Sequence, residues 1–231
     1  MIDNHPARKK KMSSATTDPD QPENESCPPD SYLTLAQPGT AEIKIQRSRF
    51  IGLASHAPDQ AAARLLIAKH ASHFHDSRHV CHAWRLGQPP RVAEIRNDDG
   101  EPSGTAGEPI LAEIRKRHLT QVVVVVVRYF GGVKLGTGGL ARAYGQAASE
   151  ALAGATDRIV KLGRTFEVRF PYALQKTLQH LLQRHEGRIE QEDYQADVSW
   201  LIWLPHSQWR AFAQELAEAS AGSVHLHEPG A

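Results

Sequence analysis

The chain has 231 residues, of which 40% are hydrophobic, and a formal net charge of +1 at pH 7 with histidine counted as neutral. This length allows two domains with a core each, and the near-neutral charge excludes a polycation that binds nucleic acid with its whole surface. Two cysteines, Cys27 and Cys81, are too few for a secreted domain of this size held by disulfides. The sequence has no run of 18 apolar residues and no apolar signal segment, so we expect a cytoplasmic protein without membrane contact.

Residues 1–30 have the composition of a disordered tail, with five prolines and almost no large apolar side chain. The basic run at residues 8–11 is an alternative nucleic-acid arm, but we favour a solvated tail, and Met12 is an alternative start. From Tyr32 the pattern becomes that of a folded domain, which we expect to span residues 31–156.

The first domain is predicted to be α+β with a mixed sheet, because strands predominate early and alternate with helices later. In chain order, the apolar spacing predicts strands at residues 43–45 and 50–53, a helix at 61–70, strands at 80–86 and 92–95, and a helix at 110–117.

The rest of this domain is organised around residues 121–153. The six consecutive valines at 122–127 cannot leave one face polar, so they predict an interior strand that is covered on both sides. A glycine-rich segment follows, and then apolar residues from Leu140 to Ala151 have helical spacing. Six Lys or Arg and a single acid lie within residues 112–143, so basic charge gathers around this stretch.

The glycine-rich segment is the first candidate site, because the free amides of a helix start bind anions and glycines allow close approach to the backbone. A dinucleotide fingerprint is rejected because its glycines do not directly follow the strand, and a P-loop is rejected because Lys134 precedes the glycines. Two interpretations stay open: an anion site, and glycines that only permit tight packing of the helix on the sheet. The candidate anion- or nucleic-acid-binding residues are Arg128, Gly131, Gly132, Lys134, Gly136, Gly138, Gly139 and Arg142.

The second candidate is the segment at residues 97–109, which contains acids, hydroxyls and glycines. Its oxygens are suited to a hard cation, but their spacing does not match an EF-hand loop, and we favour a series of tight turns that cap their own backbone. The residues concerned are Asp98, Asp99, Gly100, Glu101, Ser103, Gly104 and Thr105.

The third candidate is a group of histidines and one cysteine: His70, His73, His75, His79, His82 and Cys81. On a strand, His79 and Cys81 face one side and His82 faces the other, so the three cannot ligate one ion. A thiol nucleophile at Cys81 would need a base and an exposed position, which the sequence does not show. We favour a buried strand cysteine with surface histidines, and we expect no metal, no cofactor and no catalytic residue.

After Lys161 the pattern restarts on a smaller scale, and residues 165–228 predict the order β-α-β-β-α-β. This order is that of a ferredoxin-like domain. We expect the boundary between the two domains at residues 156–164.

Two segments carry a resemblance to the YigZ/IMPACT family: DDGEPSGTAGEPIL at residues 98–111 and VVVVRYFGGVKLGTGGLARAY at residues 124–144. Residues 47–51 and 78–85 support it, and the resemblance covers residues 32–155. It implies a ribosomal-S5-domain-2-like fold for the first domain. Eukaryotic relatives regulate translation initiation through an extra N-terminal domain, for which the first 30 residues here are too short, so we do not carry that protein partner over.

From these observations we expect a non-catalytic protein that binds RNA or the ribosome, with phosphates held at the glycine-rich segment, and that acts in the regulation of translation. The alternative is an enzyme acting on a small phosphorylated metabolite, with Asp98, Asp99 and Glu101 holding a cation opposite the glycines. A closed pocket formed by the acidic and glycine-rich segments would favour the enzyme. Basic residues spread along an open groove would favour RNA.

Overall fold

The structure is a computed structural model that describes residues 29–229. The expectations for the tail, the basic run at 8–11, Met12 and Cys27 lie outside these residues. Within the described range, no helix is long and apolar enough to cross a membrane.

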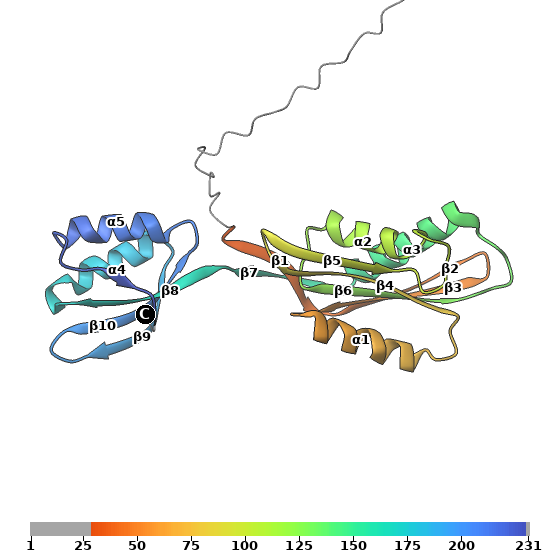
Figure 1. Cartoon of the computed structure of the whole chain (residues 1–231), viewed down its shortest axis with the longest axis horizontal. Coiled ribbons are helices and arrows are strands. Elements are labelled where there is room, and N and C mark those ends of the chain that lie inside the picture. Colours follow the sequence, from red (N-terminus) through yellow and green to blue (C-terminus); the bar gives the residue numbers. More distant parts are fainter. Residues whose placement is uncertain (1–28, 230–231) are drawn as a thin grey trace, which may run out of the picture.

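The first domain contains a five-stranded sheet with helices on both faces (Figure 1). Its strand order is β2-β3-β6-β4-β5, and every neighbouring pair is antiparallel, so the expected mixed sheet is wrong. Its elements are β2 (Gly39–Ile45), β3 (Ser48–His56), α1 (Gln60–His73), β4 (His79–Gln88), β5 (Arg91–Asn97), α2 (Gly107–Lys116), β6 (Val122–Tyr129) and α3 (Gly136–Ala153).

The central strand β6 confirms the prediction from the valine run. Val122, Val124 and Val126 pack into the core between the sheet and helices α2 and α3, whereas the alternate valines pack into the core beneath α1. Because both faces of the strand are buried, both sets of side chains are apolar. The strand therefore fixes its C-terminal residue pair, Arg128 and Tyr129, at one end of the sheet.

Helix α3 lies directly on β2 and β3, because small residues line the contact. A Cβ atom at Gly52 would lie 2.3 Å from the carbonyl oxygen of Ala147, and one at Gly39 would lie 2.1 Å from that of Ala151. Only glycine allows such an approach. The helix starts at Gly136, earlier than its apolar spacing indicates, so Gly136, Gly138 and Gly139 belong to its first turn.

A two-stranded antiparallel ribbon connects the two halves of the molecule (Figure 1). Strand β1 (Ser31–Gln37) pairs with β7 (Thr156–Lys161), which occupies most of the segment expected to separate the domains. The carboxylate of Asp157 in β7 accepts two hydrogen bonds from Arg117 Nη2, at 2.9 and 2.7 Å. The carboxylate of Asp30 accepts a hydrogen bond from the backbone N–H of Ser207 in the second domain at 2.7 Å.

The second domain confirms the predicted β-α-β-β-α-β order. Its antiparallel sheet has the strand order β11-β8-β10-β9, and α4 and α5 lie together on one face, over a core centred on Trp200 and Phe212 (Figure 1). The elements are β8 (Gly163–Phe170), a 3₁₀ turn (Tyr172–Leu174), α4 (Gln175–Arg184), β9 (Arg188–Tyr194), β10 (Val198–Pro205), α5 (Trp209–Ala219) and β11 (Leu226–His227).

Candidate functional site

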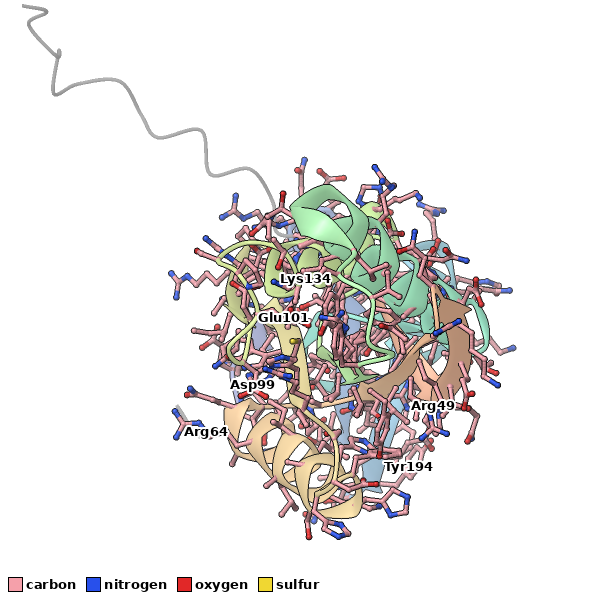
Figure 2. All side chains as sticks on the ribbon, turned by 90° about the vertical axis from the view of Figure 1, so that its right-hand side faces the viewer. Arg49, Arg64, Asp99, Glu101, Lys134 and Tyr194 are labelled. Carbon is pink, nitrogen blue, oxygen red and sulfur yellow. The ribbon has the colours of Figure 1, made fainter. Side chains whose placement is uncertain are left out.

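A pocket of about 410 Å³ lies at the end of the first domain, where the acidic segment and the glycine-rich segment meet. In Figure 2, which views the molecule from this end, Lys134 lies next to Glu101, with Asp99 and Arg49 on either side. The lining residues are Arg78, His79, Gly100, Glu101, Pro102, Arg128, Phe130, Lys134, Leu135, Gly136, Thr137 and Leu140.

The floor of the pocket is a buried ion pair. Glu101 Oε1 lies 2.5 Å from Arg128 Nη1 and accepts a hydrogen bond from the hydroxyl of Tyr144 at 2.9 Å, and the side chains of Glu101 and Arg128 are only 4% and 6% exposed. Burial raises the pKa of Tyr144, with neighbouring Cys81 and Glu101 adding to the effect, so its hydroxyl stays protonated and donates. Arg128 Nε is buried and has no hydrogen-bond partner within the described residues. The floor therefore holds an unused donor on a cation.

The carboxylates of Asp98 and Asp99 are occupied by backbone amides. Asp98 accepts from the N–H groups of Gly104, Ala106 and Gly107 at 2.8 to 2.9 Å. Burial raises the pKa of the Asp98 carboxyl, but these three hydrogen bonds outweigh burial and hold the pKa below its usual value. Asp99 Oδ2 accepts from the N–H of Val80 at 2.6 Å. Asp98 agrees with the favoured interpretation of a side chain that caps the backbone of its own segment, whereas Asp99 Oδ2 contacts β4, outside that segment.

The alternative hypothesis, an enzyme acting on a phosphorylated metabolite, needs Asp98, Asp99 and Glu101 to hold one cation together. Asp98 faces the start of α2, Asp99 faces β4, and Glu101 faces Arg128, so the three carboxylates do not converge. Across residues 29–229, no cluster of His, Cys, Asp and Glu is arranged to hold a metal ion. Ser103 and Gly104 are exposed in the turn that Asp98 organises, and the Thr105 hydroxyl donates to the carbonyl of Pro102 at 2.6 Å.

His79 and Cys81 share one face of β4, as predicted, but they differ in exposure. Cys81 is fully buried, which raises the pKa of its thiol to about 12, and Sγ donates to the carbonyl of Asp98 at 3.0 Å. His79 is not a free surface residue. Its Nδ1 lies 2.7 Å from the carbonyl oxygen of Asp99, an acceptor, so Nδ1 carries the proton. Its Nε2 is 3.9 Å from Glu101 Oε1, beside the pocket.

The glycines of the glycine-rich segment have different roles. Gly131 packs against the turn between β2 and β3, where a Cβ would lie 2.1 Å from the carbonyl carbon of Arg47. Gly132 and Gly136 have positive φ angles, of 87° and 69°, which favour glycine. Gly138 has neither a positive φ angle nor a close backbone contact, because a Cβ there would meet only Arg142 Nη1 at 3.8 Å. Gly139 lies in the same turn, against Leu135 Cβ, and no side chain caps this turn.

The basic residues divide into two groups. Lys134 and Arg78 are exposed and line the pocket. The backbone N–H of Arg78 donates a hydrogen bond to the carbonyl of Arg128, at the end of β6, at 3.3 Å. Arg142 is exposed on α3 but does not line the pocket. Arg115 is paired with Glu94 and Glu108, and Arg117 with Asp157. Part of the basic charge counted along the sequence is therefore already neutralised elsewhere.

Three arginines at this end were not among the predicted site residues. Arg78 lines the pocket and directly precedes His79, in one of the segments that carried the family resemblance. Arg47 and Arg49 flank the turn that contacts Gly131, and the guanidinium of Arg49 lies 4.4 Å from the ring centre of Tyr129. The pairing of β4 with β6 brings Arg78 to the pocket end, and the pairing of β3 with β6 brings Arg49 there, so spacing along the chain could not reveal this arrangement.

Comparison with known proteins gives matches over most of the chain. Residues 46–152 match the Impact N-terminal domain, and residues 168–223 match a domain of unknown function (DUF1949). The IMPACT family member YigZ of Escherichia coli is 36% identical over 198 residues, which cover 85% of this chain and 97% of that protein. The IMPACT family member YvyE of Bacillus subtilis is 34% identical over 200 residues, which cover 86% and 91%. A crystal structure of a hypothetical protein matches with a TM-score of 0.60 at 35% identity, and the match covers 86% of this chain and 97% of that one.

Proposed function

The chain belongs to the IMPACT family, as the resemblance predicted, and we propose that it is a non-catalytic binding protein that holds RNA, free or within the ribosome, by a phosphate group. The observation that carries the proposal is the convergence of hydrogen-bond donors on one pocket. The uncapped start of α3 lies at the pocket, and the side chains of Lys134, Arg78 and Arg128 line it.

A phosphate is the ligand that best suits these donors. Backbone amides at a helix start and cationic side chains bind phosphate oxygens without reading the base sequence. Open space at Gly132 and Gly136 allows a ligand to approach the backbone closely. The acidic segment does not oppose this, because Asp98 and Asp99 are hydrogen-bonded to amides and Glu101 is paired with Arg128.

We propose a non-catalytic function because the candidate nucleophile, the Cys81 thiol, is enclosed in the fold. The Cys81 thiol is buried with a raised pKa, so little thiolate forms near pH 7. We propose a contact with the ribosome as the route by which the protein acts in the regulation of translation in the cytoplasm.

A small phosphorylated metabolite is the second candidate ligand. It is favoured by one observation: the two segments converge on a pocket instead of an open groove. The pocket volume of about 410 Å³ is within the usual range for sites that bind small ligands, roughly 300–1,000 Å³.

Fluorescence anisotropy of a labelled single-stranded RNA, measured at several salt concentrations, tests the proposal. Lys134→Ala and Arg78→Ala should each weaken binding and flatten the slope of log affinity against log salt by roughly 0.7, since each removes one phosphate contact. Arg64→Ala is the matched control, because it removes an exposed charge from α1 on the opposite face of the sheet. Unchanged affinity and slope in both pocket variants would reject RNA binding at this site. Competition by a sugar phosphate, without any RNA binding, would support the small ligand instead.

A further inference from the structure

We infer that the pocket takes the phosphorylated end of an RNA strand, a terminal phosphate monoester, and not an internal phosphodiester. The inference rests on the proposed function and names the chemical group that this site selects. Three features of the pocket support it: its charge, its depth and the exposed aromatic ring at its wall.

The charge of the lining matches a dianion. Arg78, Arg128 and Lys134 supply three positive charges and Glu101 one negative charge, which sum to +2. A phosphate monoester carries about −1.5 to −2 near pH 7. An internal phosphodiester carries a single negative charge, so it would leave one cation of the pocket without a counter-charge.

The depth of the pocket favours a chain end. Arg128 lines the pocket, but its side chain is only 6% exposed, so a phosphate must reach the floor to contact its guanidinium. The floor beneath is closed by Tyr144 and Phe50, both fully buried. An internal phosphate is flanked by nucleotides on both sides, so the strand would have to bend sharply at that phosphate to reach the guanidinium at the floor. A terminal phosphate has one flanking nucleotide and needs one way in.

The wall of the pocket provides a surface for the nucleotide that follows. Phe130 lines the pocket and is 41% exposed, and the guanidinium carbons of Arg78 and Arg128 lie 5.9 and 5.3 Å from its ring centre. Bases stack on exposed aromatic rings independently of sequence. The start of α3, on the other side of the pocket, presents its amides to the phosphate at Gly136 and Thr137.

The test compares one RNA sequence in four forms with the full chain: with a 5′ phosphate, with a 3′ phosphate, with hydroxyls at both ends, and circularised. We expect one of the phosphorylated forms to bind about tenfold or more tightly than the hydroxyl form, because hydrogen bonds to charged groups contribute at least that much. The circle should bind like the hydroxyl form. Lys134→Ala and Arg78→Ala should remove the preference for the phosphorylated end, whereas Arg64→Ala should keep it.

The outcomes separate this inference from the function on which it rests. Equal binding of all four forms, weakened by the two pocket variants, would overturn end recognition and leave RNA binding intact. A preference for the phosphorylated end that survives in both pocket variants would also overturn the inference, because the end would then be bound elsewhere. Failure of all four forms to bind would overturn the proposed function and the inference together.

Discussion

The substitution Glu101→Gln tests the floor of the pocket. Glutamine keeps the shape of the side chain and one oxygen that can accept from Tyr144, so the main loss is the negative charge beside Arg128. Removing one partner of a buried ion pair costs about 3–5 kcal/mol, since the other charge is left uncompensated. Because the amide oxygen can still accept a hydrogen bond from Arg128, we expect a loss near the lower limit, about 3 kcal/mol in the free energy of unfolding.

Urea denaturation followed by circular dichroism measures this loss, and hydrogen exchange locates it. Exchange should become faster in β4, β6 and α3, which surround the pair. The second domain provides an internal control, because its core around Trp200 is separate from the cores of the first domain and its exchange should not change. A loss below about 1 kcal/mol would refute the argument, since it would show that water screens the pair and that the floor is not closed.

Three further predictions concern the fold around the site. A fragment of residues 30–162 should fold alone with a cooperative transition, whereas residues 32–156 should be less stable in the same denaturation assay because β1 loses its partner β7. Asp98→Asn should destabilise the protein at pH 7. Since the pKa of Asp98 is lowered in the folded state, its carboxylate stabilises the fold above about pH 4 and loses this effect as the pH falls. The difference in the free energy of unfolding between wild type and Asp98→Asn should therefore shrink below about pH 4. A difference that is unchanged at pH 2 would contradict this prediction. Gly131→Ala should lower the melting temperature, because its Cβ meets the backbone of the opposing turn, while Gly138→Ala should keep or slightly raise it, because Gly138 has no positive φ and alanine favours a helix.

The elements with strong periodicity could be predicted from the sequence. The valine run of β6 has apolar residues on both faces because helices cover both, and that pattern is visible without a structure. The β1–β7 ribbon could not be predicted in the same way. Its strand β7 is mostly exposed and carries Asp157, Arg158 and Lys161, so it lacks the alternation that marks a strand on a core.

The candidate site could be predicted only in part. Lys134 and Gly136, which the sequence suggested as candidates for an anion site, line the pocket, and Asp98 caps the backbone of the acidic segment. The link between the two segments is the pair of Glu101 with Arg128, which are 27 residues apart in the chain. A contact at that separation depends on how the loop folds back over the sheet, and no local pattern reports it.

The buried pair itself is better explained by ligand binding than by stability. A buried ion pair is weak evidence for stability, because replacing both partners with apolar residues is often neutral or stabilising by about 1–4 kcal/mol. The double variant Glu101→Leu with Arg128→Met should therefore recover most of the stability that Glu101→Gln loses. The same double variant should lose the preference for a phosphorylated RNA end, because it removes the cation that Arg128 supplies at the floor. A stable double variant with wild-type RNA affinity and end preference would show that the pair serves only the fold, and Arg128 would then have no part in binding.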